Sequence, residues 1–471
     1  MKTRFTKAAA AVAVAALTAF PLFAAGRGSA NFQNFVAIGD SYGAGYESGA
    51  LNANHQVFSW PAIIARQVGL TLCEPTAVAT TNCFAQPLVS GPNNELTLRD
   101  LGGTITPSAG GGSPLMLTFG RPYNNLSIPG ATVTDVITLT GKSTEGAASQ
   151  LVLRGLGTEV QLAAAQHPTF IAIWIGGNDL LGATAAGMPA LLTPTDKFKA
   201  SYEAMLDQLI AAAPSAGMVV GTLPTNAQAV PYVSTIPPFL VNGTAPVLGP
   251  DGKPIYYVAD LGGGNFGQLP AGSFVLLPAL AKIRTGYGIP AALGQIPPFN
   301  QLPNVGKPLA DSDVLTPTEA AAIVTRANEY NAVITAAAAA RNIPVADIKG
   351  LFDRVVVNPA TGAGGINVGP VRLTNAFVTG GFFSLDGVHL TDLGYILFAN
   401  EYIKAINNGY NAGIPLASIT QVFANNGAMF GHEDDSKFNP GSFSITSSAA
   451  AQMKAVWSFA SASRRFRAAS H

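Results

Sequence analysis

The feature that most constrains the fold is an apolar run that leads directly into a Gly-Asp-Ser turn. Residues 35–38 read Phe-Val-Ala-Ile, which suits a buried strand, and the turn at residues 39–41 follows at once. Open α/β sheets bind their ligands at the carboxyl edge of the strands. A serine at that edge, here Ser41, can act as a nucleophile if a base and an oxyanion site lie within reach. The simpler alternative is that Ser41 only caps a helix.

Further strands and helices alternate along the chain, and this alternation indicates the fold class. Residues 169–175 read Thr-Phe-Ile-Ala-Ile-Trp-Ile, a continuous run typical of central parallel strands. Residues 218–221 and 343–348 are predicted as further strands. Helices are predicted over residues 58–68 and 159–166, and others are predicted to begin at Thr193, Thr316 and Thr391. The pattern predicts a three-layer α/β/α fold with a mostly parallel central sheet.

Between the first two strands, a Gly/Ser/Pro-rich stretch at residues 102–120 is predicted as a loop. Residues 123–132 then indicate a short strand, a turn at Pro129-Gly130 and the start of a helix. The N–H of Gly130 can bind an anion at such a turn, although a plain turn glycine is the commoner role. Asn178, which follows the strand at 169–175, is either a loop residue or a side-chain donor aimed into a site.

Two segments do not fit the alternation. Residues 223–315 are rich in Pro and Gly and contain apolar patches, so we expect an inserted subdomain or lid rather than one long loop. The apolar residues of this insertion either pack on each other or line a pocket for an apolar ligand. Residues 411–471 lose all periodicity and carry the basic residues Arg464, Arg465 and Arg467. This extension either docks as an extra element or stays free.

The first thirty residues have the pattern of a signal peptide. Lys2, Arg4 and Lys7 give a basic start, residues 8–23 are an Ala-rich apolar run, and residues 28–30 fit a small-x-small cleavage site. A membrane anchor is the alternative, but the run is short for a span of about 20 residues. We therefore expect an exported protein, secreted or in the periplasm or cell envelope. The folded domain is expected over residues 31–410, with no membrane span after removal of the leader.

The composition excludes some function classes. The chain of 471 residues has 48% hydrophobic residues, and 26 basic residues balance 26 acidic ones, so no net charge favours a nucleic acid partner. The only cysteines, Cys73 and Cys83, are predicted to form a disulfide in an oxidising compartment, with two free buried thiols as the alternative. Two cysteines alone cannot complete a four-ligand zinc site, and no metal site is expected.

Of the five histidines, only His389 has an acid at a short loop spacing, Asp386 three residues before it. An aspartate in that position can bond Nδ1 and leave Nε2 free to take a proton from a serine. The alternative is a surface Asp and His near a helix start. His432, in a Gly-His-Glu-Asp-Asp stretch, is expected in a solvated loop, with a divalent-ion site as a remote second possibility.

Together these stretches resemble the SGNH hydrolases, also called the GDSL lipase/esterase family, in four blocks that follow the family's order. Residues 39–42 resemble the first block and residues 124–132 the second. Residues 176–179 (Gly-Gly-Asn-Asp) resemble the third, and residues 386–389 the last. One departure is Tyr42, where the family has leucine; that position packs or lines the site and does not react.

The resemblance implies the fold of this family and a role for each matching residue. It implies Ser41 as nucleophile, His389 as base and then acid, and Asp386 as the residue that orients the imidazole. The implied oxyanion donors are the N–H groups of Ser41 and Gly130 and the Asn178 amide. No metal or organic cofactor is implied.

The function expected from this resemblance is secreted ester hydrolysis, lipase- or esterase-like, through an acyl-enzyme on Ser41. The expected partner is a small ester or lipid. One alternative is a carbohydrate O-acetyl esterase that uses the same residues. An alternative of another class is an exported binding or envelope protein with a disused site.

Overall fold

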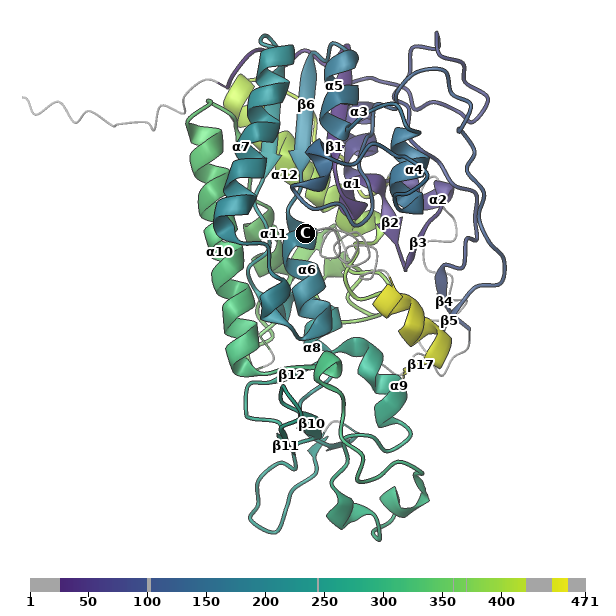
Figure 1. Ribbon diagram of the computed structural model, residues 1–471, viewed down its shortest axis with the longest axis vertical. Coiled ribbons are helices and arrows are strands. Elements are labelled where there is room, and N and C mark those ends of the chain that lie inside the picture. Colours follow the sequence, from purple (N-terminus) through teal and green to yellow (C-terminus); the bar gives the residue numbers. More distant parts are fainter. Residues whose placement is uncertain are drawn as a thin grey trace, which may run out of the picture.

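The structure is a computed structural model, and Figure 1 shows its two parts. A larger body contains a sheet between helices, and a smaller part extends from one end of it around β10 (Val258–Asp260), β11 (Phe266–Gln268) and α9 (Leu280–Ile283). The structure describes residues 26–99, 103–243, 245–358, 360–369, 371–420 and 443–455. Residues 1–25 of the expected signal peptide (residues 1–30), His432 and the three tail arginines therefore lie outside the described residues.

The centre of the larger body is a parallel sheet. Its strand order is β1 (Phe35–Gly39), β6 (Phe170–Trp174), β7 (Gly217–Gly221) and β14 (Val345–Ala346). All residues of β1, β6 and β7 are buried, as expected for strands covered on both faces. Beside β1, residues 124–126 add a single parallel bridge, in which the Leu126 N–H donates to the Ala37 carbonyl at 2.9 Å.

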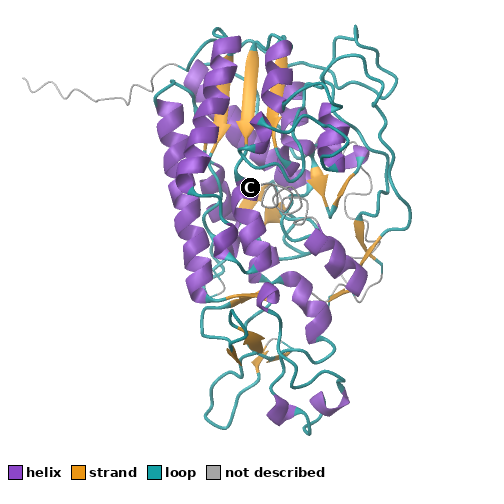
Figure 2. Cartoon of the chain, viewed as in Figure 1, coloured by secondary structure: helices purple, strands orange, loops and turns teal. Residues whose placement is uncertain are grey.

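Helices cover both faces of the sheet, so the predicted three-layer α/β/α fold is confirmed (Figure 2). One face carries α3 (Trp60–Gln67), α11 (Ile348–Val355) and α12 (Asp392–Tyr410), and the other carries α5 (Glu159–Ala165), α7 (Thr195–Ala212) and α10 (Pro317–Ala339). The predicted capping box of α10 is present, since Thr316 and Glu319 bond each other's backbone N–H. Thr391 caps α12 as predicted.

The remaining elements are short. They are α1 (Ser41–Ala44), β2 (Tyr46–Glu47), β3 (Ala50–Leu51), α2 (Ala53–Gln56), β4 (Leu96–Leu98), β5 (Thr104–Pro107), α4 (Ala147–Leu153), α6 (Gly177–Ala186), α8 (Pro231–Ser234), β8 (Val241–Asn242), β9 (Ala245–Pro246), β13 (Val314–Leu315), β15 (Ile366–Val368), β16 (Val371–Leu373) and β17 (Ser444–Ile445). The 102–120 stretch is therefore not entirely loop, because it contains β5.

Two of the predicted helix starts are wrong. At Thr132 the chain makes only a 3₁₀ turn at Asp135–Ile137, because Thr132 N–H and Oγ1 both bond the Asp135 carboxylate. Poor helix formers, among them Gly141, follow this turn and do not extend it. Thr193 does not cap α7, whose N-cap is Pro194.

The strand predicted over residues 343–348 is shorter than expected. It is limited to β14, because Asp347 ends it by capping α11, where its carboxylate accepts the Gly350 N–H at 2.8 Å. Ile348 is therefore the first residue of a helix rather than the last of a strand.

The insertion over residues 223–315 has an apolar core of its own, separate from the main core. It contains β10 (Val258–Asp260), β11 (Phe266–Gln268), β12 (Phe274–Val275) and α9 (Leu280–Ile283). Its buried residues are Ile236, Leu240, Tyr257, Ala259, Leu269, Val275, Ala279, Ile289, Leu309 and Val314. Most of the apolar residues of the insertion thus pack on each other.

Part of the C-terminal extension docks on the fold. β17 pairs with β5, and residues 447–455 form a helix that lies beside α9 in Figure 1. Lys454 on this helix and Lys282 on α9 both bond the buried carboxylate of Asp313, at 2.6 and 2.5 Å. The extension is thereby tied to the insertion.

Residues 26–29, which belong to the expected leader, contact the larger body. Gly26 N–H donates to the Gly409 carbonyl at 2.7 Å, and Ser29 forms a bridge with Ala216. Within the described residues, no helix combines the length and apolar character needed to cross a membrane.

Candidate active site

Ser41 lies in a one-turn helix directly after β1. Asp40 caps this helix α1, because its carboxylate accepts the Tyr42 N–H at 3.0 Å, and Gly45 ends it in the left-handed conformation with φ 73°. Gly43 allows close approach of Ser127, since a Cβ on Gly43 would lie 2.1 Å from Ser127 Oγ. Ser41 is the first residue of α1, where a backbone N–H has no acceptor within the helix.

The structure brings Ser41, His389 and Asp386 together in a chain of hydrogen bonds. His389 Nε2 lies 2.8 Å from Ser41 Oγ, and His389 Nδ1 lies 2.8 Å from Asp386 Oδ2. The side chains of His389 and Asp386 are fully buried, and Ser41 is 6% exposed. Such a hydroxyl–imidazole–carboxylate chain can transfer the serine proton to the imidazole as the oxygen attacks.

Every hydrogen-bond partner of the Asp386 carboxylate is a donor. Oδ1 accepts the backbone N–H groups of Val388 and His389 at 2.9 and 2.8 Å, and Oδ2 accepts the N–H of Gly49 at 2.9 Å. Ser384 Oγ adds a longer bond of 3.3 Å. Burial opposes the charge of Asp386, but His389 and the backbone donors outweigh it and hold its pKa below the usual range.

Two tyrosines hold the imidazole loop in place: Tyr42, which the sequence analysis expected to pack or line the site, and Tyr46, which it did not single out. Tyr42 donates its hydroxyl to the Val388 carbonyl at 2.6 Å, one residue before His389. The ring of Tyr46 packs against the His389 ring with 4.7 Å between centroids. Both contacts join residues more than 340 positions apart, so no local pattern could have indicated them.

Asn178 and the Gly130 turn also lie together. Asn178 is buried in the first turn of α6, which follows β6, and its Nδ2 donates to the carbonyl of Ala131 at 2.9 Å. Gly130, the preceding residue, has φ 85°. Asn178 and Ser41 contribute to the wall of one cavity. Three segments thus converge at the carboxyl edge of the sheet, as the fold requires: α1 after β1, the Gly130 turn after residues 124–126, and α6 after β6.

The cavity beside Ser41 is apolar and has a volume of about 100 Å³. Apart from residues next to Ser41 in the chain, its wall comes mainly from α6, from α10 and from the first part of the insertion, residues 223–233. Trp174 at the end of β6, Phe352 on α11 and Val388 complete the wall. The apolar side chains include Leu180, Leu181, Leu223, Val233, Ile323 and Ala327. The insertion therefore both packs on itself and contributes to a pocket, so neither expected alternative excludes the other.

A second buried acid supports the turn that carries Ser41. Glu159 is fully buried at the start of α5, and its Oε2 accepts the Gly39 N–H at 3.1 Å. Burial raises the pKa of Glu159 well above its usual value, and the charges of Asp40 and Asp135 raise it further, against the effect of the Gly39 bond.

Replacing Glu159 by glutamine is expected to flatten the pH dependence of stability. Because the pKa of Glu159 is raised in the folded protein, the unfolded chain releases its proton first, above about pH 4.3. The free energy of unfolding should therefore fall from that pH up to the folded pKa, by at most about 1.4 kcal/mol per pH unit. Urea unfolding at about pH 5 and about pH 8 should show a smaller fall for Glu159→Gln than for wild type. The exposed control Glu74→Gln should follow wild type; equal falls in all three proteins would contradict the prediction.

Cys73 and Cys83 are joined by a disulfide in the structure. The bond lies in a small apolar cluster with Met116, Phe119 and Tyr123, away from Ser41. The disulfide closes a loop of the chain between residues 73 and 83, which lies between α3 and the segment that leads to the Gly130 turn.

Comparison with known proteins gives a family but no curated relative. Residues 35–402 match the family described as GDSL-like Lipase/Acylhydrolase. No curated protein matches the chain significantly. Because the family match spans most of the chain, it covers all four sequence blocks described above.

Several solved structures are similar to this chain, and the following three each share low sequence identity with it. A phospholipase A1 from Streptomyces albidoflavus is 14% identical, with a TM-score of 0.32, 80% of this chain covered and 100% of that chain. An extracellular lipase from Streptomyces rimosus is 16% identical, with a TM-score of 0.31 and coverage of 79% and 97%. An acetyl-xylooligosaccharide esterase mutant from Geobacillus is 14% identical, with a TM-score of 0.32 and coverage of 80% and 95%.

Proposed function

Since this chain belongs to the GDSL-like lipase/acylhydrolase family and is a carboxylic ester hydrolase, we propose that it is a lipase-like enzyme for esters of apolar acyl chains. The observation that carries the proposal is the apolar cavity that includes Ser41 in its wall. Burying a hydrocarbon chain there removes apolar surface from water, worth about 0.8 kcal/mol for each buried CH₂ group. A short acetyl group would leave most of these side chains without a contact.

In the proposed reaction, Ser41 Oγ attacks the ester carbonyl carbon while His389 Nε2 takes the hydroxyl proton. His389 then gives that proton to the leaving alcohol, and an acyl-enzyme on Ser41 remains. Water attacks the acyl-enzyme in the same way and releases the acid. Asp386 keeps Nδ1 protonated and stabilises the imidazolium. The 2.8 Å contacts on both sides of the imidazole support these roles.

The proposed oxyanion site consists of the N–H groups of Ser41 and Gly130 and the amide of Asn178. Ser41 N–H is supported by its place at the start of α1. Asn178 is supported by its bond to the Ala131 carbonyl, which holds the amide at the Gly130 turn. Fixed donors of this kind stabilise the charge that develops in the tetrahedral intermediate.

Replacing Asn178 by alanine is expected to lower kcat by about 10²–10³-fold, because one oxyanion donor is lost. The KM for a p-nitrophenyl ester should change far less, since the charge develops only after binding. Asn328→Ala, which removes an exposed amide on α10, is the matched control and should leave kcat unchanged. A kcat within a few-fold of wild type for Asn178→Ala would remove Asn178 from the oxyanion site.

The chain-length preference tests the proposed substrate class. Wild type should hydrolyse p-nitrophenyl decanoate faster than the acetate, in kcat/KM, whereas a carbohydrate O-acetyl esterase would show the reverse. Ala327→Leu narrows the cavity from α10 and should lower kcat/KM for the decanoate by about 10–200-fold relative to the acetate. Ala336→Leu makes the same change on an exposed part of α10 and should keep the wild-type ratio. If Ala327→Leu also keeps that ratio, the acyl chain does not bind in this cavity.

We also propose export, on the basis of the basic start and Ala-rich run within residues 1–25. The contacts of residues 26–29 with the larger body favour cleavage ahead of them rather than after Ala30. The N-terminal sequence of the protein recovered outside the cytoplasm checks both points, and recovery of only uncleaved chain from the cytoplasm would contradict them.

A further inference from the structure

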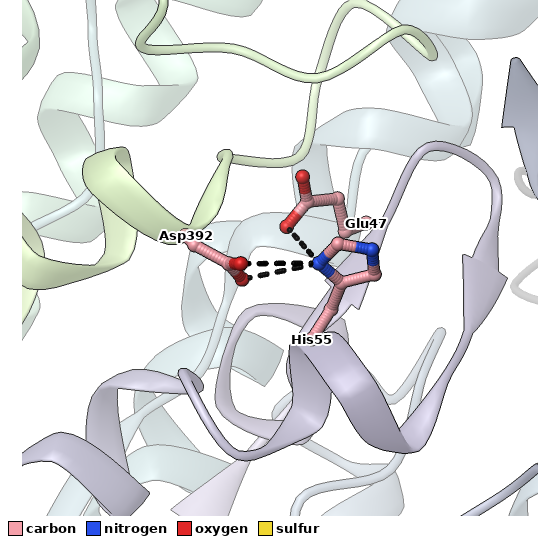
Figure 3. A group of neighbouring side chains, drawn as sticks. All are labelled: Glu47, His55 and Asp392. Atoms are coloured by element: carbon pink, nitrogen blue, oxygen red, sulfur yellow. Dashed lines mark hydrogen bonds and ion pairs between the residues drawn. The ribbon is translucent and has the colours of Figure 1, made fainter. Parts of the chain in front are cut away.

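A second cluster of charged side chains lies next to the hairpin formed by β2 and β3, which follows α1. His55 on α2 lies between the carboxylates of Glu47 on β2 and Asp392 at the start of α12 (Figure 3). A third carboxylate, that of Glu95, lies 3.1 Å from its other ring nitrogen. Figure 3 shows Glu47 and Asp392 both pointing at the same ring nitrogen of His55. The ligand atoms of Glu47, His55 and Asp392 all lie within 4.8 Å of one another.

The distances around His55 differ from those of a charge-assisted hydrogen bond. Nδ1 lies 3.2 Å from each carboxylate oxygen of Asp392 and 3.4 Å from Glu47 Oε2. An imidazolium N–H usually bonds one carboxylate oxygen at about 2.7–2.9 Å. His389 does so with Asp386 in this same protein, at 2.8 Å. Three oxygens share the Nδ1 of His55 instead, as ligands arranged around a common centre would.

The burial of Glu47 gives an independent indication of a cation site. Glu47 is 8% exposed, and its Oε2, which points into the cluster, is buried without a hydrogen-bond partner among the described residues. Asp392, the second carboxylate, is 2% exposed. Two buried carboxylates that face each other repel, and a buried charge is costly unless it is paired or binds a metal.

We propose that Glu47, His55 and Asp392 bind a zinc ion through Oε2, Nδ1 and a carboxylate oxygen. Ligands bound at about 2.0–2.1 Å in a tetrahedron are about 3.3 Å apart, which is close to the observed 3.2 and 3.4 Å. The fourth ligand is water, which the 25% exposed His55 side chain can admit. Calcium is disfavoured because it requires six to eight oxygen ligands.

Glu95 completes the arrangement from outside the ligand set. Its Oε1 lies 3.1 Å from His55 Nε2, and its Oε2 accepts a bond from Asn52 Nδ2 at 2.8 Å. A metal-bound histidine typically donates its other N–H to a carboxylate in this way, which fixes the ring and the tautomer. Nδ1 is thereby left deprotonated and available to the metal.

The zinc site joins the elements that support the catalytic loop. Glu47 precedes Ser48 and Gly49, whose N–H groups donate to Ser384 Oγ and Asp386 Oδ2, both at 2.9 Å. Asp392 follows His389 by three residues. A metal bound between Glu47 and Asp392 would therefore fix the position of the β2–β3 hairpin relative to the loop that carries Asp386 and His389. It would do so without contacting substrate. This inference does not depend on the proposed acyl preference.

The experiment uses the full mature chain without an affinity tag, stripped with EDTA and titrated with ZnCl₂. We expect one tightly bound zinc ion per chain by elemental analysis and calorimetry, and a rise in Tm on binding. Glu47→Gln and His55→Gln should lose stoichiometric binding. Glu95→Gln should retain one site but bind about 10–100-fold more weakly, because only the outer partner is changed.

Controls separate this site from other histidines. His167→Gln, at an exposed histidine, and His432→Gln, in the acidic stretch noted in the sequence, should bind zinc as wild type does. Wild type that binds no zinc would overturn the proposal and leave protonated His55 as the cation of the cluster. Full binding by His55→Gln would also overturn it. Since the wild-type titration alone can decide, a variant that fails to fold does not prevent the test.

Discussion

Ser41→Ala is expected to lower kcat for ester hydrolysis by about 10⁴–10⁶-fold while leaving the protein folded. The loss is large because Ser41 Oγ is the atom that bonds the acyl group, and it lies 2.8 Å from His389 Nε2, the base that takes its proton. A small residual rate should remain from binding and the oxyanion donors. Tm should change little, since removing the hydroxyl leaves no large void.

Ser127→Ala is a matched control for this prediction. Ser127 is also buried and lies against Gly43 in α1, but its hydroxyl has no hydrogen-bond partner among the described residues. Its replacement should leave kcat within a few-fold of wild type. An organophosphorus probe should label wild type on Ser41 and fail to label Ser41→Ala. Wild type without label, or more than a few per cent activity in Ser41→Ala, would support a disused site instead.

Asp386→Asn is expected to lower kcat by about 10⁴-fold. The two oxygens of Asp386 each accept from one pair of donors: the backbone N–H groups of Val388 and His389, and the pair formed by Gly49 N–H and His389 Nδ1. Asparagine has one oxygen, so its NH₂ group must face one of these two pairs. If the amide faces Nδ1, His389 is held with its proton on Nε2 and cannot accept the Ser41 proton. The other orientation places NH₂ against backbone donors, which destabilises the loop.

The same variant should also change stability in a pH-dependent way. The pKa of Asp386 is depressed in the folded protein, so its stabilising contribution is complete above about pH 3.9, the usual Asp value. That contribution is lost as the pH falls through the lower folded pKa. The difference in unfolding free energy between wild type and Asp386→Asn should therefore be largest near neutral pH and shrink in acid.

Asp353→Asn serves as the control for Asp386→Asn. Asp353 is partly exposed and pairs with Lys349 on α11, so its replacement should change kcat and stability little. Activity above about a tenth of wild type in Asp386→Asn would show that His389 does not need this carboxylate. A stability difference that grows as the pH falls would contradict the depressed pKa.

The sequence predicted the central sheet well because the relevant signals are local. Residues 35–38 and 169–175 are continuous apolar runs, which only a doubly covered strand can bury, and both form strands of the parallel sheet. The capping chemistry at Thr316 and Thr391 likewise acts within a single turn. The same capping signals gave wrong helix starts at Thr132 and Thr193. At Thr132 the bonds to the Asp135 carboxylate and the poor helix formers that follow limit the chain to a 3₁₀ turn. At Thr193 the helix begins after Pro194 instead.

The insertion and the zinc cluster show what a linear pattern does not contain. Composition could not decide whether residues 223–315 pack on themselves or form a pocket, because both require the same apolar side chains. His55 gave no signal, since its partners Glu47 and Asp392 come from elements 345 positions apart in the chain and each looks like an ordinary surface residue. The docking of residues 443–455 was likewise left open.

By itself, the sequence determined the central strands β1, β6 and β7, the long helices and the polar residues at the strand ends, since hydrophobic periodicity and capping act over a few residues. It also indicated the chemistry, because four short blocks, which contain Ser41, Gly130, Asn178 and the Asp386–His389 pair, resemble those of one hydrolase family in order. Only the tertiary structure decided that Ser41 meets His389, 348 positions away, at 2.8 Å. It alone shaped the cavity and gathered the carboxylates around His55. Such contacts depend on how whole elements pack, and packing decides positions to within the few tenths of an ångström on which a hydrogen bond or a metal site depends.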